Sequence, residues 1–419
     1  MTQVTYFSNL MQDAKGAGHS ICMVDRRVTA SMLLLLASCS SSDKTSAPPP
    51  PPPLATDAQM AAFTRAFHIP LTIAETGGAM GVVVPDTGAP TVILSPMVFP
   101  SVYSYANATL TVASQSVPNV PILSSSEQCP DPAFVLGGLV GGPVLFNHVV
   151  SFDYRDGIVA FGNTRAAGGL SPDIAMPFAL EGQESTIGDD PTPLPPSRVV
   201  VVANIEGATY RMLLDTGASA VTVDQATFAA LTADGRVTRA WTPSSGSSYE
   251  YARVHTMSVS AASAQDVVIF HDTSADETIA EISFEMGDTI HGLIGGTFLE
   301  RFEVTLDYPN KELHLAPYED TSFLVDNFHS VGMDIGERVK GGYRIANVPH
   351  ETDAEAKGVL AGDAIVAIDG QAVDPLSLSQ VEVLLSGPVG STKSVEFGVA
   401  ENLANQTVDI RVDDLLPLP

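Results

Sequence analysis

The chain has 419 residues, 45% of them apolar and only 7% aromatic, which is enough for two or three globular domains with mainly aliphatic cores. The formal net charge is −28. Nucleic acids and anionic membrane surfaces would be repelled by such a chain, so we expect neither as a direct partner.

The first 38 residues are typical of a secretory signal. Arg26 and Arg27 precede a short apolar run at 32–36, and small residues follow. This run is too short to span a bilayer. We therefore expect a signal peptide over residues 1–38, with Met23 as an alternative start of the chain.

The signal ends on Leu36-Ala37-Ser38-Cys39, which resembles a bacterial lipobox. The resemblance implies cleavage before Cys39 and lipidation of its thiol. The alternative is that Cys39 is an incidental small residue. Ser40, instead of Asp, follows Cys39, which by resemblance to known sorting signals favours the periplasmic face of the outer membrane in a bacterial cell envelope. Residues 39–59, rich in Ser and Pro, would form a stiff tether, so the membrane is a partner through the lipid anchor only.

Cysteine usage excludes a disulfide framework in the folded part of the chain. Of the three cysteines, Cys22 and Cys39 precede that part, and Cys129 is expected to be a buried small residue. No Cys/His cluster has the spacing of metal ligands. We therefore expect no metal and no cofactor.

An internal repeat organises the middle of the chain. Residues 139–142 (Leu-Val-Gly-Gly) recur as 293–296 (Leu-Ile-Gly-Gly), and Asp153 recurs as Asp307, both at an offset of 154 residues. A spacing shared by two separate signatures is unlike a chance match. It predicts two lobes of related fold.

The repeat extends upstream to two short acidic turns. Strand-like runs lead into Asp86-Thr87-Gly88-Ala89 and into Asp215-Thr216-Gly217-Ala218, and each Asp lies 8 residues after a turn glycine, Gly78 or Gly207. The repeat therefore makes Asp86 the counterpart of Asp215. We expect lobe 1 over residues 60–165 and lobe 2 over 198–317.

The two copies differ in length and are joined by a polar segment. The second copy is longer by 25 residues, which fall in a helix-like stretch at 225–233 and a polar tip at 243–248. That tip is either a mobile hairpin over a cleft or a plain exposed loop. Between the copies, residues 166–197 are expected to be a linker, since 182–197 are rich in Pro, Asp and Ser.

A strand, then Asp-Thr-Gly-Ala, then an apolar-apolar-Gly strand resembles the aspartic peptidases, and above all their retropepsin-like branch. The resemblance covers roughly residues 66 to 316. It implies a mainly β, two-lobed acid-protease β-barrel fold, built from tandem retropepsin-like lobes. It also implies that Asp86 and Asp215 are the catalytic pair and that strands 139–141 and 293–295 pack against the catalytic turns. The residues implied to support the catalytic loops are Thr87, Gly88, Ala89, Thr216, Gly217 and Ala218.

Two carboxyl groups within hydrogen-bond distance share one proton, because charging both is costly. The ionised Asp then takes a proton from a water, and the protonated Asp donates to the scissile carbonyl oxygen. In pepsin-like relatives a Ser or Thr after the Gly hydrogen-bonds the carboxylate and lowers its pKa. Ala89 and Ala218 stand there in this chain. We therefore predict a pair that titrates higher and an activity optimum nearer neutral pH.

Two prolines in the first copy leave alternatives open. Pro85 stands where an apolar strand residue is expected, and Pro90 stands where the second copy has Ser219. If lobe 1 is degenerate, the chain is a catalytically inactive peptide-binding envelope protein, or an enzyme active only as a homodimer through Asp215. Neither a Gly-x-Ser-x-Gly nor a His-Glu-x-x-His motif offers another chemistry.

Residues 358–373 resemble the most distinctive part of a PDZ domain, which predicts an α+β domain over 328–413. The resemblance implies that a peptide C-terminus can add as a strand. We expect Gly341, Gly342 and Tyr343 to form its binding loop and a helix at 378–385 to form the other groove wall; the alternative is a purely structural domain.

Taken together, the sequence predicts an aspartic endopeptidase acting on peptides or unfolded proteins outside the cytoplasm.

Overall fold

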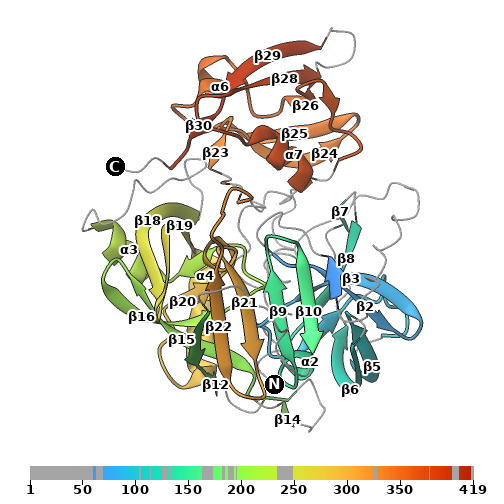
Figure 1. The fold of residues 1–419 in the computed structure, drawn as a ribbon. Helices are drawn as coiled ribbons and strands as arrows, with labels where there is room; N and C mark the ends of the chain where they lie inside the picture. Colours follow the sequence, from blue (N-terminus) through green and yellow to red (C-terminus); the bar gives the residue numbers. More distant parts are fainter. Residues whose placement is uncertain are drawn as a thin grey trace.

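A computed structural model of the chain describes most of the region after residue 59 (Figure 1). The described residues are 60–62, 69–102, 105–113, 115–124, 130–131, 134–162, 173–181, 185–186, 193–194, 196–233, 249–324, 326, 328–376, 378–398 and 405–416. The predicted signal peptide, Cys39, the tether, Cys129 and the polar tip at 243–248 lie outside them. Among the described residues, no helix is both long and apolar enough to cross a bilayer.

A six-stranded sheet joins the two lobes at their base, in the order β1-β10-β9-β21-β22-β11. Its strands are β1 (Met60–Ala62), β9 (Val149–Asp153), β10 (Ile158–Gly162), β11 (Ile174–Pro177), β21 (Phe302–Asp307) and β22 (Glu312–Pro317). At its centre β9 pairs antiparallel with β21, and Ser151 lies opposite Thr305. These two residues are 154 positions apart, and their hydroxyls are hydrogen-bonded at 2.8 Å. The two copies of the repeat therefore meet at equivalent positions.

Lobe 1 is a closed barrel of six strands. They are β2 (Thr72–Thr76), β3 (Ala79–Pro85), β4 (Val92–Leu94), β5 (Tyr105–Val112), β6 (Gln115–Ser124) and β8 (Phe134–Val140), with β7 (Pro130–Asp131) paired to β8 and α2 (Gly142–Leu145) after it. Gly77 and Gly78 turn the chain from β2 into β3, with φ of 58° and 77°. Both values lie in the left-handed region that glycine adopts at low cost.

Lobe 2 repeats this barrel. Its elements are β12 (Ala179–Glu181), β15 (Arg198–Ile205), β16 (Ala208–Leu214), β17 (Val221–Val223), α3 (Gln225–Ala233), β18 (Tyr249–Val259), β19 (Ala262–Asp272), α4 (Thr273–Met286), β20 (Gly292–Ile294) and α5 (Gly296–Leu299). The pairing of β15 with β18 closes it, as the pairing of β3 with β8 closes lobe 1. The predicted mainly β, two-lobed acid-protease fold is confirmed.

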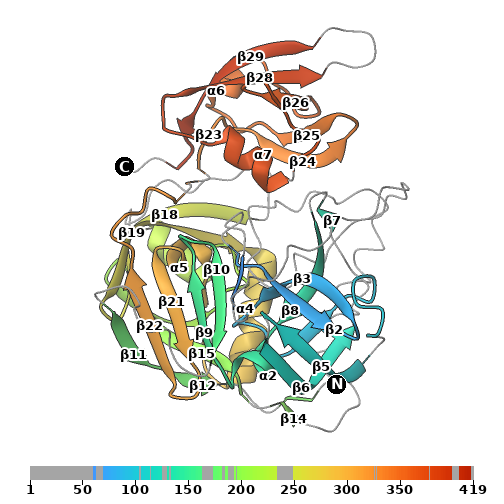
Figure 2. The ribbon, with the colours of Figure 1, turned by 45° about the vertical axis from the view of Figure 1, so that its right-hand side comes forward.

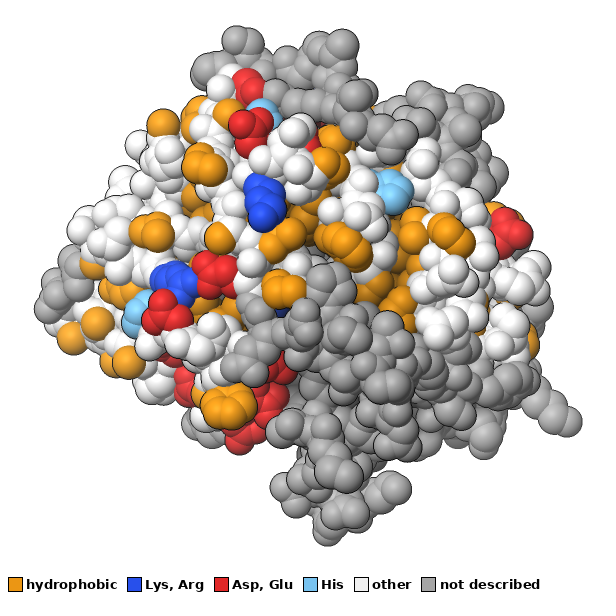
Figure 3. Space-filling model, turned by 90° about the horizontal axis from the view of Figure 1, so that it is seen from below, with side chains coloured by type: hydrophobic (Ala, Val, Ile, Leu, Met, Phe, Trp, Pro, Cys, Tyr) orange, Lys and Arg blue, Asp and Glu red, His pale blue; other side chains and the backbone are white. Residues whose placement is uncertain are grey.

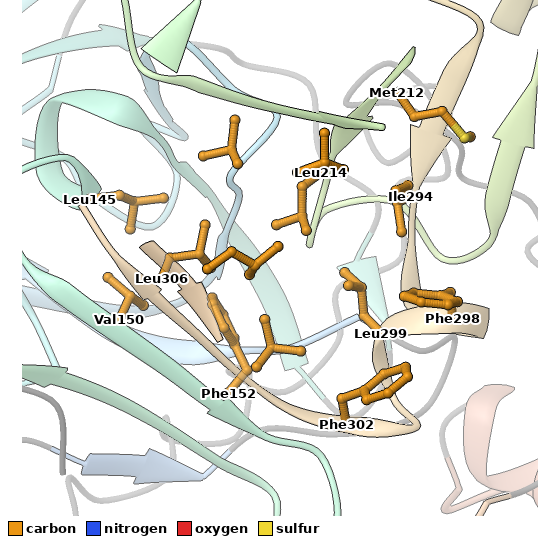
Figure 4. Packing of buried hydrophobic residues seen from close by; sticks show 14 of the residues in the cluster. Leu145, Val150, Phe152, Met212, Leu214, Ile294, Phe298, Leu299, Phe302 and Leu306 are labelled. Atoms are coloured by element: carbon orange, nitrogen blue, oxygen red, sulfur yellow. The ribbon is translucent and has the colours of Figure 1, made fainter. Parts of the chain in front are cut away.

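One continuous apolar core runs through both lobes. Leu145, Val150 and Phe152 come from lobe 1, and they share a cluster with Leu214, Ile294 and Leu306 of lobe 2 (Figure 4). Because these side chains are almost fully buried, sliding one lobe against the other would expose apolar surface to water. The core thus fixes the relative position of the two acidic turns.

The segment before lobe 2 and one helix of lobe 2 differ from the sequence expectations. The predicted linker at 166–197 contains β11 and β12, which extend the interlobe sheet and the lobe 2 sheet, and a small hairpin of β13 (Ser185–Thr186) and β14 (Pro193–Leu194). The 14-residue helix α4 was not predicted. Its buried Ala275, Ile279 and Ile282 have the spacing of a helix face, a signal that was present in the sequence.

The C-terminal domain is a separate sheet and core that lies beside the two lobes (Figures 1 and 2). Its sheet order is β24-β25-β26-β28-β29. The elements are β23 (His329–Ser330), β24 (Asp334–Val339), β25 (Gly342–Asn347), α6 (Asp353–Ala356), β26 (Ala364–Ile368), β27 (Gln371–Ala372), α7 (Leu378–Leu385), β28 (Thr392–Gly398), β29 (Gln406–Arg411) and β30 (Asp413–Asp414). In both views α7 lies on the side of this domain that faces the lobes.

A buried arginine holds this domain against lobe 2. Arg253 of β18 is only 4% exposed; its Nε donates to the carbonyl of Leu416 at 3.1 Å, and its guanidinium pairs with Asp326 at 2.7 Å. Around it, Phe328, Leu415 and Leu416 pack into one apolar cluster with residues of lobe 2, among them Ala220 and Tyr251. The contact surface therefore adjoins the segment that follows the second acidic turn.

The structure places the predicted peptide-binding loop, Gly341 to Tyr343, at a hairpin and in the core of the C-terminal domain. Gly341 lies in the tight turn between β24 and β25, where Val339 pairs with Gly342. Gly341 has a φ of 86°, and a Cβ on Gly342 would lie 1.9 Å from the carbonyl oxygen of Ile365. Tyr343 is buried, and its hydroxyl donates to the Leu376 carbonyl at 2.8 Å. These residues are explained by the hairpin and the core.

We predict different costs for the two glycines. Gly342→Ala forces a Cβ against backbone, so it should destabilise the C-terminal domain by about 2 kcal/mol or more. Gly341→Ala meets no atom within 4 Å and pays only the left-handed conformation, about 1 kcal/mol. Calorimetric unfolding of both variants measures the difference. Equal costs would show that the close approach to Ile365 is absent.

Candidate active site

The two acidic turns are held in place by the strands that the repeat predicted. Asp86 follows β3, and its N–H donates to the carbonyl of Val140 on the parallel strand β8 at 2.9 Å. Asp215 follows β16, and its N–H donates to the carbonyl of Ile294 on the parallel strand β20 at 3.0 Å. Each Asp thus leaves its strand at an equivalent point.

Two glycines let these strands approach the turns. A Cβ on Gly141 would lie 2.3 Å from the carbonyl oxygen of Ala89, and one on Gly295 would lie 2.2 Å from that of Ala220. Any other residue would push the strand away from the turn, because these contacts are to backbone. The apolar-apolar-Gly pattern is therefore a packing requirement of the acidic turns.

The turns are cross-linked by their threonines. The Thr87 hydroxyl donates to the carbonyl of Leu214 at 2.8 Å, and the Thr216 hydroxyl donates to that of Pro85 at 2.6 Å. Each hydroxyl also accepts the backbone N–H of the other threonine, at 3.1 and 3.0 Å. All four bonds are buried and cross from one lobe to the other. They fix the turns relative to each other.

The carboxyl groups of Asp86 and Asp215 come together at this cross-link. A Cβ on Gly88 would lie 2.6 Å from the Asp215 carboxyl carbon, and one on Gly217 would lie 2.5 Å from Asp86 Oδ2. Each carboxyl group therefore lies over the glycine of the opposite turn. The two are also hydrogen-bonded to each other, and only 2% of Asp86 and 5% of Asp215 is exposed.

Burial raises the pKa of both aspartates. For Asp86, the negative charge of Asp215 and the hydrogen bond between them raise it further, well above its ordinary range. The N–H groups of Gly88 and Ala89 donate to Asp86 Oδ1 at 2.8 and 3.0 Å and oppose this rise. The pair can therefore keep one proton at a pH where isolated aspartates have lost theirs.

Neither turn adds a side-chain donor to its carboxyl group. Ala89 and Ala218 occupy the positions after the glycines and are almost fully buried. Their N–H groups bond the carboxyls, but their methyl side chains cannot. This leaves the carboxylate form with fewer hydrogen bonds than a Ser or Thr would give.

Pro85 fits the geometry of the first turn, whereas the lobes differ next to Pro90. The pairing of β2 with β3 ends at Thr72 and Val83, so Pro85 lies beyond the last pair and its missing N–H breaks no such bond. Its carbonyl still accepts from Thr216. In lobe 2, the Thr297 N–H donates to the Ser219 carbonyl at 3.2 Å. In lobe 1, Pro90 takes the place of Ser219 and Pro143 takes the place of Thr297, so this bond is missing because Pro143 has no N–H.

Two buried tyrosines lie near the pair. Burial raises the pKa of Tyr154, and the charges of Glu300 and Asp215 raise it further. Burial and then the charge of Asp86 do the same for Tyr308. Both phenols are therefore neutral, and they add no charge to the site.

Sequence reasoning missed Arg198, the first residue of β15. Its Nε donates to the carbonyl of Gly88 at 3.1 Å, and its guanidinium pairs with Glu285 of α4. The sequence signal was weak, because a basic residue at the start of an apolar strand is ordinary. In the described part of the chain, no cluster of His, Cys, Asp and Glu is arranged to hold a metal ion.

Comparison with known proteins points to the second lobe. Residues 201–298 match the family model described as aspartyl protease. Over these residues, lobe 2 is therefore similar to an aspartyl protease domain. No curated protein matches the chain.

Solved structures were also compared. The aspartic proteinase from Irpex lacteus is 15% identical with a TM-score of 0.41, covering 63% of this chain and 98% of that one. A photosystem II D1 C-terminal processing protease is 27% identical with a TM-score of 0.20, covering 20% of this chain and 23% of that one.

We predict that Thr216→Val weakens the cross-link between the lobes. The change leaves the buried Pro85 carbonyl and Thr87 N–H without their partner, at a cost of about 2 to 4 kcal/mol. Thr216→Ser keeps the hydroxyl and should lose less than half of that. Chemical denaturation measures both. A loss in Thr216→Ser as large as that in Thr216→Val would contradict a dominant contribution of the hydroxyl.

We also predict that Asp86→Asn changes how stability depends on pH. Because the folded pKa of Asp86 is raised, the folded state holds a proton that the unfolded state has lost above about 4. Wild-type stability therefore falls as pH rises through the folded pKa. Asn does not titrate, so the free energy of unfolding of the variant should gain on the wild type from pH 4 to pH 7. A difference independent of pH would contradict the raised pKa.

Proposed function

We propose that the protein is an aspartic endopeptidase that uses Asp86 and Asp215 of one chain. The observation that carries this is the buried, hydrogen-bonded carboxyl pair, held by four reciprocal bonds from Thr87 and Thr216. The aspartyl protease match over residues 201–298 supports the same chemistry.

The arrangement suits direct attack of water on a peptide bond. One carboxylate accepts a proton from a water held between the two groups, and the protonated partner donates to the carbonyl oxygen of the scissile bond. The carboxyl group that took the water proton then gives it to the leaving nitrogen as the C–N bond breaks, and the other carboxylate takes a proton back from a hydroxyl of the tetrahedral intermediate. The chain needs no nucleophilic side chain, and burial keeps both carboxyls in place.

The alternatives rested on Pro85 and Pro90. The contacts of Pro85 support an intact first turn, since its carbonyl completes the cross-link. A catalytically inactive binding protein, or a homodimer that pairs Asp215 with its copy, is therefore not needed to explain Pro85. Both remain outcomes that the experiment below separates.

We further propose that the C-terminal domain is a PDZ module that binds peptide C-termini. The sequence Val331-Gly332-Met333 has the apolar-Gly-apolar pattern, lies just before β24, and contacts α7 through the N–H of Val331 to the carbonyl of Leu385 at 3.3 Å. In the described sheet β24 is a terminal strand, so its outer edge can pair with a peptide. This loop replaces Gly341 and Gly342 as the candidate.

The location is proposed from the N-terminal segment alone. A lipidated Cys39 and a Ser/Pro tether would hold the enzyme at the bacterial cell envelope, on the periplasmic face of the outer membrane. Its substrates would then be peptides or unfolded proteins of that compartment. On the face drawn in Figure 3, few basic side chains lie beside the acidic ones, in agreement with the net charge of −28.

Cleavage of a denatured protein pool by the purified protein tests the function. We expect Asp86→Asn and Asp215→Asn each to lower the rate by about 10²-fold or more, because each removes an acid or base. If only Asp215→Asn matters and the rate rises with the square of concentration, the homodimer is correct. No cleavage by the wild type would leave the inactive binding protein. A pH optimum below about 3 would contradict the predicted effect of Ala89 and Ala218.

A further inference from the structure

The inference concerns Arg198 and rests on the proposed function. Arg198 belongs to lobe 2, yet its Nε donates to the Gly88 carbonyl in the acidic turn of lobe 1, at 3.1 Å. Its guanidinium also pairs with Glu285 of α4. The residue is only 9% exposed. A buried cation that spans both lobes at the carboxyl pair calls for an explanation beyond surface charge.

The hydrogen bond from Arg198 holds the Gly88–Ala89 peptide unit, which lies next to the carboxyl pair. The Gly88 carbonyl and the Ala89 N–H belong to the same planar peptide, and that N–H donates to Asp86 Oδ1 at 3.0 Å. The Gly88 Cα lies against the Asp215 carboxyl group. By fixing this one peptide, Arg198 fixes a donor to Asp86 and the surface on which Asp215 rests.

The arginine also breaks the symmetry of the repeat. At the same offset that relates Asp86 to Asp215, the counterpart of Arg198 in lobe 1 is Ile69, which is buried and apolar. No cation therefore reaches the Gly217 turn from the equivalent position. A positive charge on one side of the pair favours one of its two ionised forms.

The groups around the carboxyl pair favour the form in which Asp215 is ionised. Burial raises the pKa of Asp215, but the hydrogen bond from Asp86, the N–H groups of Gly217 and Ala218, and the charge of Arg198 oppose the rise. For Asp86, the charge of Asp215 and the hydrogen bond between the two carboxyl groups raise the pKa further. The other titratable groups nearby are Glu281 and Glu285 on α4, Glu300 after α5, and the neutral Tyr154 and Tyr308.

We propose that Arg198 is a positioning residue of the carboxyl pair: it holds the Gly88–Ala89 peptide and makes Asp215 the carboxylate that activates water, while Asp86 carries the proton. Arg198 itself touches neither substrate nor water in this role. Glu285 weakens the effect of Arg198 on Asp215, because the negative charge of Glu285 offsets part of the guanidinium charge.

The test compares four variants of the full chain. Arg198→Met removes the charge, Arg198→Lys keeps it without the planar fork, and Glu285→Gln removes the counter-charge. Arg211→Met is the matched control: Arg211 pairs with Glu181 and Asp288 from the neighbouring strand β16 and contacts no acidic turn. The readouts are the pH dependence of kcat/KM and that of the free energy of unfolding.

Opposite shifts are expected from the two charges. Arg198→Met should move the acidic limb of kcat/KM to higher pH, with about a tenfold loss on that limb. Glu285→Gln should move it to lower pH. Arg198→Lys should keep the wild-type limb with a lower kcat, and Arg211→Met should change neither. If Arg198→Met only destabilises the protein and its limb coincides with that of the wild type, the proposal is wrong.

The stability readout separates this proposal from the proposed function. The carboxyl pair takes up its proton in the folded state whether or not the protein cleaves peptides. Removing the Arg198 charge should therefore extend the fall in stability to higher pH relative to wild type. A wild type that cleaves nothing but shows this shift would refute the function and keep the role of Arg198. An unchanged profile in Arg198→Met would refute the role of Arg198 alone.

Discussion

The reciprocal bonding of Thr87 and Thr216 is the interaction on which the rest of the structure depends. The hydroxyl of each threonine makes two hydrogen bonds to the opposite lobe: it donates to a carbonyl and accepts from an N–H. Two carboxyl groups that repel each other when charged can stay in contact only if the backbone beneath them cannot separate. The shared apolar core and the interlobe sheet supply the same constraint on a larger scale.

The two lobes are equivalent in backbone but not in charge or surroundings. Ser151 and Thr305 face each other at the centre of the interlobe sheet, as counterparts in a repeat should. The departures all favour lobe 2 as the more elaborate partner: it carries Arg198 where lobe 1 has Ile69, and the C-terminal domain docks on it through Arg253. A pair of aspartates in such a frame has distinct environments and therefore distinct roles.

The repeat made much of this structure predictable. Its fixed offsets identified both acidic turns, the glycine strands behind them and the two barrels, because a duplicated fold needs the same residues at the same bends. The sequence also located the helix at 225–233 and the strand at 364–368, where local pattern and tertiary structure agree. These are features that a residue and its near neighbours determine.

What escaped prediction depends on contacts between distant segments. Arg198 bonds a carbonyl 110 residues away, and no local pattern records that contact. Gly341 and Gly342 were predicted to be part of a binding loop, and only the pairing of β24 with β25 shows that they lie at a hairpin turn. Pro85 raised doubt because its effect depends on where the pairing of β2 with β3 ends.

The central claim is that Asp86 and Asp215 of one chain hold a single proton between them. Neutron diffraction from deuterium-exchanged crystals, grown at a pH where the protein is active, observes this directly. We expect carboxyl oxygens in hydrogen-bond contact and one deuteron between the two groups, on the Asp86 side. Carboxyl groups out of contact, or a pair without any deuteron, would contradict it.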